Sequence, residues 1–204
     1  MDPSAPPPEL PLVAGRSCGE CNVCCVALTI RDPELQKAQG HRCRNALPDN
    51  SCAIYATRPQ QCRSFFCGWR HLKWVRDPLR PDRSGVLIRL HGEVTRETGA
   101  VRMGVVFTLL NAAALRAEGL AESVAAAVAA DVPVFLNIPG PPGYTSAQVK
   151  INEVLAEPVR VKDKRAVLGI LRQLRRLGLK GEKQKIRLDP EADAAQDATA
   201  IAPE

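Results

Sequence analysis

The stretch Cys18-Gly-Glu-Cys21-Asn-Val-Cys24-Cys25 opens a run of cysteines that decides how the first third of this chain folds. Four more cysteines follow, so that all eight cysteines of the 204-residue sequence lie between positions 18 and 67: Cys18, Cys21, Cys24, Cys25, Cys43, Cys52, Cys62 and Cys67. A C-x2-C pair places two thiolates about one turn apart, where both face one ion. Thiolates are soft ligands that prefer zinc or iron–sulfur centres to magnesium or calcium. We therefore predict that all eight cysteines are metal ligands.

The adjacent Cys24 and Cys25 constrain how these thiols are shared. In extended backbone, successive side chains point to opposite faces, so two adjacent sulfurs do not easily serve one tetrahedral ion. We therefore predict two neighbouring metal sites that share the region of the first C-x2-C pairs. The spacing leaves open how the later cysteines divide between these sites: Cys43, Cys52, Cys62 and Cys67.

The spacing leaves the metal open between zinc, as two ions, and an iron–sulfur cluster. The run Cys18-x2-Cys21-x2-Cys24 matches the first three positions of a bacterial ferredoxin run. In that run the fourth cysteine follows after three residues and precedes proline, whereas Cys25 follows Cys24 at once. The C-x3-C-x2-C spacing of radical enzymes that use S-adenosylmethionine is absent from the sequence. Disulfide or purely redox use of the thiols ranks third, because a reducing compartment disfavours it.

A second stretch of the sequence resembles a known family. It reads Cys52-Ala-Ile-Tyr55-Ala-Thr-Arg58-Pro59-Gln-Gln-Cys62-Arg63-Ser-Phe65-Phe-Cys67. With the eight cysteines, it resembles the YkgJ-type cysteine-cluster family, which is described as a zinc- or iron-chelating domain and named for its CxxCxxCC motif. The resemblance covers about a quarter of the chain, and it includes the eight cysteines and the Tyr55, Arg58-Pro59 and Arg63 framework. It implies metal chelation and no particular reaction.

Composition divides the chain into four zones. Residues 1–14 form a Pro-rich leader that we expect to be disordered. Residues 15–76 form a loop-rich cysteine-cluster domain that metal stabilises, because its turn formers separate the cysteines and its few aromatics follow them. Residues 77–188 form a small α+β region, and residues 189–204 form an acidic tail that we expect to be disordered. The predicted fold class is therefore α+β.

The α+β region shows strand and helix patterns in turn. Short runs rich in β-branched and aromatic residues predict strands at 85–90, 103–109 and 132–138, and another around 185–188. Apolar residues at helical spacing predict helices over 120–130 and 164–177. Asp163 is a suitable N-cap for the second helix, and Gly178 is expected to stop it.

Net charge is +6, and the cysteine zone is itself basic, with 12 basic and 8 acidic residues over positions 1–85. Two four-thiolate sites that hold divalent cations would add a compensating negative charge. We therefore expect six arginines to offset thiolate charge: Arg16, Arg42, Arg44, Arg58, Arg63 and Arg70.

Other classes of function find less support in the sequence. It holds no G-x-S-x-G, Walker or dinucleotide motif, so we lean against an enzyme and assign no catalytic residue. An iron–sulfur redox protein is the first alternative. The span 160–187 carries eleven basic and two acidic residues, so a zinc-stabilised nucleic-acid-binding protein is the second, although this span lacks aromatics for base stacking. His71 is expected to be no ligand, and His41 and His91 to be solvated.

The expected location is the cytoplasm. No apolar run approaches the roughly 20 residues that cross a bilayer, which argues against a membrane partner. The segment 1–11 holds five prolines and lacks the basic and apolar regions of a secretory signal. The sequence names no protein partner.

Overall fold

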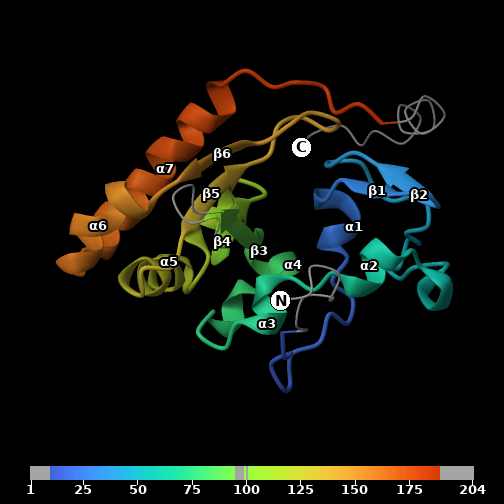
Figure 1. The fold of residues 1–204 in the computed structure, drawn as a ribbon, viewed down its shortest axis with the longest axis horizontal. Coiled ribbons are helices and arrows are strands. Elements are labelled where there is room, and N and C mark those ends of the chain that lie inside the picture. Colours follow the sequence, from blue (N-terminus) through green and yellow to red (C-terminus); the bar gives the residue numbers. More distant parts are fainter. Residues whose placement is uncertain (1–9, 95–98, 100, 189–204) are drawn as a thin grey trace.

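The computed structural model describes residues 10–94, 99 and 101–188 and shows an α+β fold around a four-stranded mixed sheet (Figure 1). The strands lie in the order β3-β4-β5-β6, with bounds Val86–Val94, Val101–Leu109, Val134–Ile138 and Ala147–Lys150. The β4–β5 pair is parallel, and the β3–β4 and β5–β6 pairs are antiparallel. The predicted α+β class is therefore confirmed.

One face of the sheet is covered by three helices, α5 (Leu120–Ala129), α6 (Asn152–Arg160) and α7 (Lys164–Lys180) (Figure 1). Since side chains alternate along a strand, Val105 and Phe107 both point to this face. They pack in the main core against buried helix residues, among them Leu120, Val124, Leu155, Val167 and Leu171. Each such side chain contributes roughly 1.5–3 kcal/mol by leaving water. This core fixes the position of the sheet.

The predicted elements of this region largely exist. β3, β4, β5 and α5 lie within a few residues of their predicted bounds. α5 joins the parallel strands β4 and β5, which need such a crossover. Asp163 caps α7, because its carboxylate accepts a hydrogen bond from the Ala166 N–H at 2.9 Å. Within the described residues, no helix is both long enough and apolar enough to cross a membrane.

The prediction that Gly178 stops α7 is wrong. The helix continues to Lys180, and Gly178 lies inside it against the sheet. A Cβ at this position would lie 2.9 Å from Cγ1 of Ile138 and 3.4 Å from Cβ of Ala147. The glycine therefore serves close helix–sheet packing rather than helix termination.

The two glycines of α7 give a matched pair of substitutions. We expect Gly169→Ala to stabilise the protein by about 0.5–1 kcal/mol, because a Cβ there has no heavy atom within 4 Å and alanine favours helix. Gly178→Ala should be less stable than Gly169→Ala by about 1–2 kcal/mol, because its Cβ meets Ile138. Urea unfolding of both variants checks this. Equal stabilisation by the two alanines would show that the helix does not press on the sheet at Gly178.

The strand predicted around 185–188 is also wrong. Lys185 forms only an isolated antiparallel bridge with Tyr144, and Ile186 N–H donates to the Gly143 carbonyl at 2.7 Å. β6 and α6 were not predicted. Pro158 lies inside α6, where it removes one backbone donor and so hides the helix from a sequence pattern.

A surface ion pair joins α5 to α7 and gives a pH-dependent contribution to stability. Lys164 Nζ lies 2.8 Å from Glu122 Oε1, and this hydrogen bond lowers the pKa of Glu122. The contribution is therefore present above the unfolded-state pKa of a glutamate and is lost as pH falls through the lower folded-state pKa. We expect Glu122→Gln to cost about 0.5 kcal/mol at pH 7, since solvent screens the pair, and nothing near pH 2. Urea unfolding at both pH values measures this, and an equal cost at both would contradict it.

Residues 15–76, which we call the cysteine module, contain only short elements: α1 (Val23–Ala27), β1 (Ile30–Asp32), β2 (Leu35–Lys37), η1 (Tyr55–Thr57), α2 (Gln60–Ser64) and α3 (Gly68–His71). β1 and β2 pair as a small antiparallel hairpin. A separate small core consists of buried Ile30, Leu35 and Cys43, with Cys25 and Cys62 packed against it. Three buried residues supply little apolar stabilisation for a segment of this length.

The end of the cysteine module packs into the main core. Trp69 and Val75 are buried there, and a Cβ at Gly68 would meet Ile88 of β3 at 2.6 Å. The next segment forms η2 (Asp77–Leu79) and α4 (Pro81–Ser84), and Leu79 has no exposed surface. Residues 77–85 are therefore packed against the sheet.

A second joint links the cysteine module to the β5–β6 connection. Gly143 N–H donates to the Gln39 carbonyl at 2.9 Å, and the Gln39 amide donates to the Tyr144 carbonyl. Gly40 has φ +82°, and a Cβ there would lie 2.7 Å from the Pro142 Cα, so only glycine fits this approach. His41 is 6% exposed here, so the expectation that it is solvated is wrong.

Candidate metal centre

The thiols of the first cysteine run are positioned by a turn and a short helix. Gly19 has φ +50°, and Cys21 N–H closes the turn on the Cys18 carbonyl at 2.9 Å. Cys24 and Cys25 both lie in α1. The extended backbone assumed for this pair is therefore wrong, and the two side chains leave the helix about 100° apart.

One set of four cysteines, thiol group 1, gathers around the start of α1 and the start of α3: Cys18, Cys21, Cys24 and Cys67. Burial raises the pKa of Cys67, and the nearby Cys18 and Cys21 raise it further. The pKa of Cys24 is raised first by its hydrogen bond with Cys25, then by burial, and also by Cys21 and Cys18. These thiols are close enough to resist simultaneous ionisation.

The other four cysteines form thiol group 2 beside the small core: Cys25, Cys43, Cys52 and Cys62. Cys43 N–H donates to the Cys25 carbonyl at 2.9 Å, and an isolated bridge pairs Ala46 with Cys52. Burial raises the pKa of Cys62, and Cys43, Cys25 and Cys52 raise it further. Burial is also the first cause of the raised pKa of Cys43, with added contributions from Cys25 and Cys52.

The two groups meet at the adjacent cysteines of α1. The hydrogen bond from Cys24 lowers the pKa of Cys25 to about 6, with further lowering by Lys37 and Arg42. Within this pair, Cys24 therefore holds its proton while Cys25 ionises first. A metal ion would displace both protons, because thiolates are the ligands.

The donor set fits thiolate metals in number and in type. All eight cysteines are free, and each group has four, the number that a structural zinc or a cubane iron–sulfur cluster uses. In the described part of the chain, however, no three His, Cys, Asp or Glu side chains already have the geometry to hold a metal ion. Since zinc–sulfur bonds are about 2.3 Å long, the sulfurs of each group must move together on binding.

Only some of the predicted arginines lie at the sulfurs. Arg70 Nη1 donates to Cys18 Sγ at 3.7 Å, and Arg42 lowers the pKa of Cys25. The others bind backbone or side-chain groups: Arg16, Arg44, Arg58 and Arg63. Burial raises the pKa of Cys21, and Arg80, which was not predicted, opposes this shift and donates to the Cys18 carbonyl at 2.8 Å. The charge-offset hypothesis thus has support at two of its six arginines.

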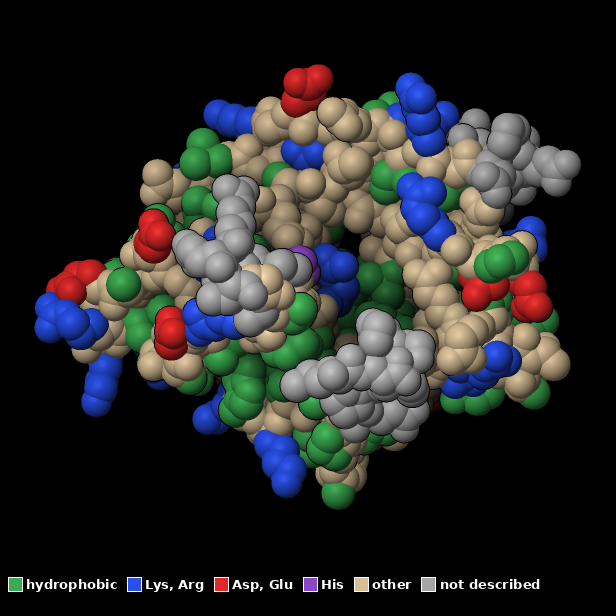
Figure 2. Space-filling view, in the orientation of Figure 1, with side chains coloured by type: hydrophobic (Ala, Val, Ile, Leu, Met, Phe, Trp, Pro, Cys, Tyr) green, Lys and Arg blue, Asp and Glu red, His purple; other side chains and the backbone are tan. Residues whose placement is uncertain are grey.

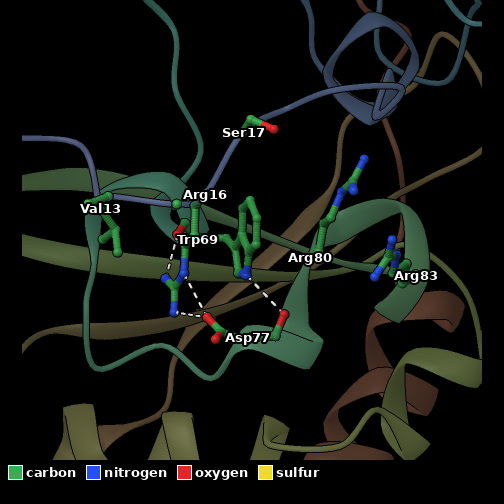
Figure 3. A pocket seen from close by; sticks show the side chains of 9 residues that line it. Val13, Arg16, Ser17, Trp69, Asp77, Arg80 and Arg83 are labelled. Carbon is green, nitrogen blue, oxygen red and sulfur yellow. Dashed lines mark hydrogen bonds and ion pairs between the residues drawn. The ribbon is translucent and has the colours of Figure 1, made fainter.

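Arg16 instead ties the segment before Cys18 to the segment after α3. Its guanidinium donates to the carbonyls of Trp69 at 2.6 Å and Val75 at 2.6 Å and pairs with Asp77 (Figure 3). Arg16, Trp69 and Asp77 line a cavity of about 490 Å³ that Arg80 and Arg83 also border. Arg16 therefore positions Cys18 and Cys67 relative to each other.

Lys37 is a buried cation that sequence reasoning missed. It is 2% exposed, and its ammonium donates to the carbonyls of Val26, Leu28 and Ala38. Burial lowers its pKa to about 8, and thiols of both groups, Cys43 foremost, oppose this shift. No sequence signal marks it, because lysine is almost always exposed.

Of the histidines, His71 contacts the Pro11 carbonyl at 3.3 Å and the edge of Phe66, and no thiol contact of it is seen among the described residues.

We expect Lys37→Met to destabilise the protein by about 2 kcal/mol, because three buried carbonyls lose their donor while the packing of the stem remains. Lys73→Met is the matched control, since Lys73 is exposed in the same module, and it should change stability by less than about 0.5 kcal/mol. Urea unfolding of the two variants measures both effects. Indistinguishable variants would contradict a structural role for the Lys37 ammonium.

The fold and the site define this chain as an α+β protein whose cysteine module carries eight free thiols in two groups. No protein-family model, no curated protein and no solved structure matches it. The resemblance to the cysteine-cluster family therefore stays a prediction that the residues alone carry.

Proposed function

We propose that this chain is a non-enzymatic, accessory metal-binding protein whose cysteine module binds two zinc ions or an iron–sulfur centre. Thiol group 1 and thiol group 2 would each supply four ligands. The observation that carries the proposal is that all eight cysteines are free and lie near one another, four beside the starts of α1 and α3 and four beside the small core, with Cys24 and Cys25 joining the two groups. Four thiolates complete a tetrahedral structural site and leave no open position for a substrate.

The thin core of the cysteine module supports the same proposal. Its separate apolar cluster holds three buried residues, Ile30, Leu35 and Cys43, and one of these is itself a proposed ligand. A module of this kind needs another source of folding free energy, and metal binding supplies it in small cysteine domains. The cations Lys37, Arg42 and Arg80 would balance part of the thiolate charge.

An iron–sulfur redox protein is the alternative that the site favours next. The adjacent Cys24 and Cys25, whose side chains are hydrogen-bonded to each other, would bring two clusters, or a bridged pair of metals, close together. Such proximity suits electron transfer more than it suits two independent structural ions.

Nucleic-acid binding ranks third. Of the basic residues in 160–187, Arg160 pairs with Glu157, Lys164 pairs with Glu122, and Lys183 donates to the carbonyls that end α7. Several exposed basic side chains remain, and binding to RNA or DNA that weakens steeply with salt would support this alternative.

Elemental analysis and an absorption spectrum of protein purified without oxygen or chelator test the proposal. About two zinc ions per chain and a colourless solution would indicate two closed structural sites. Iron with acid-labile sulfide and a broad band near about 400 nm would indicate clusters and redox chemistry. A folded chain that takes up neither metal after reconstitution would overturn the proposal.

A further inference from the structure

The cavity beside Trp69 has no role in the metal proposal, because none of the eight cysteines lines it. Its volume is about 490 Å³, which is in the range of sites that hold small molecules. Its walls come from residues 13–17 and from residues between 69 and 83. Ala14 and Ser17 at its rim are exposed, so a ligand can enter it from solvent. Figure 2 shows basic side chains distributed over the visible face of the molecule, whereas this cavity gathers three arginines at one place.

The charge of these three arginines exceeds that of the carboxylates beside them. Arg16 Nε donates to Asp77 Oδ1 at 2.8 Å. Arg80 Nε lies 3.0 Å from Asp82 Oδ1. Arg83 makes no hydrogen bond and no ion pair among the described residues. Two carboxylates therefore face three guanidiniums, and one positive charge is left uncompensated at the cavity.

Arg80 has donors that the protein does not use. Its Nη2 donates to the Cys18 carbonyl at 2.8 Å. Its Nε is buried and has no hydrogen-bond partner among the described residues, since the nearby Asp82 oxygen lies at ion-pair distance without hydrogen-bond geometry. Buried donors are normally paired, because an unpaired one loses its hydrogen bonds to water. The guanidinium of Arg80 is therefore a place where an oxygen acceptor from a ligand would be stabilising.

Arg80 and Arg83 are neighbours on one helical turn. Arg83 N–H donates to the Arg80 carbonyl at 3.1 Å, and α4 begins directly after Arg80. Side chains three residues apart on such a turn lie on the same side of it. In Figure 3, Trp69 stands between Arg16 and this arginine pair. Two like charges held close together repel each other, and an anion bound between them removes that repulsion.

The rest of the wall supplies a hydroxyl group and a fixed aromatic ring. The Ser17 hydroxyl makes no hydrogen bond among the described residues, and it borders the cavity. The indole N–H of Trp69 donates to the Asp77 carbonyl at 3.0 Å, and the Arg16 guanidinium carbon lies 5.1 Å from the ring centroid. These two contacts hold the ring in place. A hydroxyl donates to an oxyanion, and an aromatic ring packs against the apolar part of a ligand.

We propose that this cavity binds a small molecule through a carboxylate or phosphate group held by Arg80 and Arg83. Ser17 donates to the same group, and Trp69 contacts the remainder of the ligand. Carboxylate and phosphate are named together because the arginine fork recognises both. The proposal does not rest on metal binding, because no proposed metal ligand lines the cavity.

Tryptophan fluorescence of the full chain tests the proposal, because Trp69 is one of two tryptophans. Trp74→Phe removes the other, which is 37% exposed, and leaves Trp69 as the single reporter at the cavity. This variant is titrated with inorganic phosphate and with acetate, each against sodium chloride of equal ionic strength. The Trp69 emission should change and saturate with at least one of them, with a dissociation constant of roughly 1 mM. The anion that binds more tightly identifies the ligand group.

Arg83→Gln in the Trp74→Phe background should bind that anion about tenfold more weakly, since one charge-assisted contact is lost. Arg83 is exposed and has no partner among the described residues, so this variant should keep the melting temperature of its parent. Arg172→Gln is the matched control, because it removes an exposed arginine of α7 that does not line the cavity. It should keep the anion affinity of the parent.

Calorimetric titration of the native chain repeats the measurement without the tryptophan substitution and should give the same dissociation constant. Metal content is measured for every variant. A chain that takes up no metal but binds the anion through Arg83 would contradict the metal proposal alone.

Three results would overturn the cavity proposal. The first is that neither anion binds the native chain beyond the effect of chloride. The second is an anion affinity of Arg83→Gln equal to that of its parent. The third is an equal loss of affinity in Arg83→Gln and Arg172→Gln, which would mean that binding follows the net charge of the chain and not this cavity.

Discussion

Removal of the proposed metal is expected to unfold residues 23–64 and to leave the sheet intact. The separate core of this region has three buried residues, whereas β3, β4 and β5 share the large core with α5, α6 and α7. Structural zinc in small cysteine domains supplies about 10–16 kcal/mol of apparent binding free energy, more than such a thin core provides. The loss should therefore appear as complete loss of amide protection over residues 23–64.

Hydrogen exchange before and after treatment with a strong chelator measures this effect. Amides of Val86–Val94, Val101–Leu109 and Val134–Ile138 should remain protected, and so should those around Trp69, because these residues pack in the main core. Addition of zinc should restore protection over residues 23–64. Unchanged protection there in protein shown to be free of metal would mean that metal does not fold the cysteine module.

Single substitutions in the two thiol groups should remove one metal site each. We expect Cys67→Ser to lose the ion of thiol group 1 and keep the other, and Cys43→Ser to do the reverse. Serine is nearly isosteric but supplies no thiolate, so a four-thiolate site loses one of its four ligands. The expected metal content falls from about two ions per chain to about one in either variant.

His71→Gln is the matched control, because His71 contacts the Pro11 carbonyl and Phe66 and is not a proposed ligand. It should retain both ions. Quantitative metal analysis of the three variants decides between two independent sites and one shared centre. Loss of all metal in both cysteine variants would show a single polynuclear centre bridged through Cys24 or Cys25.

Much of the α+β region follows from local patterns. The runs of β4 and β5 are apolar at consecutive positions, because both faces of these strands are buried, and their β-branched and aromatic residues favour a strand. The apolar stripe of α7 repeats at the helical period. The missed elements lack such a pattern. β6 is a short edge strand with mostly exposed residues, and α6 contains Pro158, so tertiary contacts rather than local preference define them.

Gly178 and Lys37 show why residue type alone gave a wrong prediction at one position and none at the other. Gly178 has the residue type of a helix stop, yet its role is to let α7 approach Ile138. Lys37 has the residue type of a surface position, yet its ammonium donates to the carbonyls of Val26 and Leu28 in the segment after α1 and to that of the adjacent Ala38. Residue type reports local preference, and contacts between distant segments override it.

The sequence by itself determined the eight candidate ligands, the soft character of the metal that they suit, and the α+β class, because these depend on residue chemistry and on short periods. Only the tertiary structure decided which later cysteines belong together, since Cys67 joins Cys18 and Cys21 through the packing of α3. Strand alternation determines which face a side chain occupies, but the neighbours that it meets there come from segments far apart in the chain.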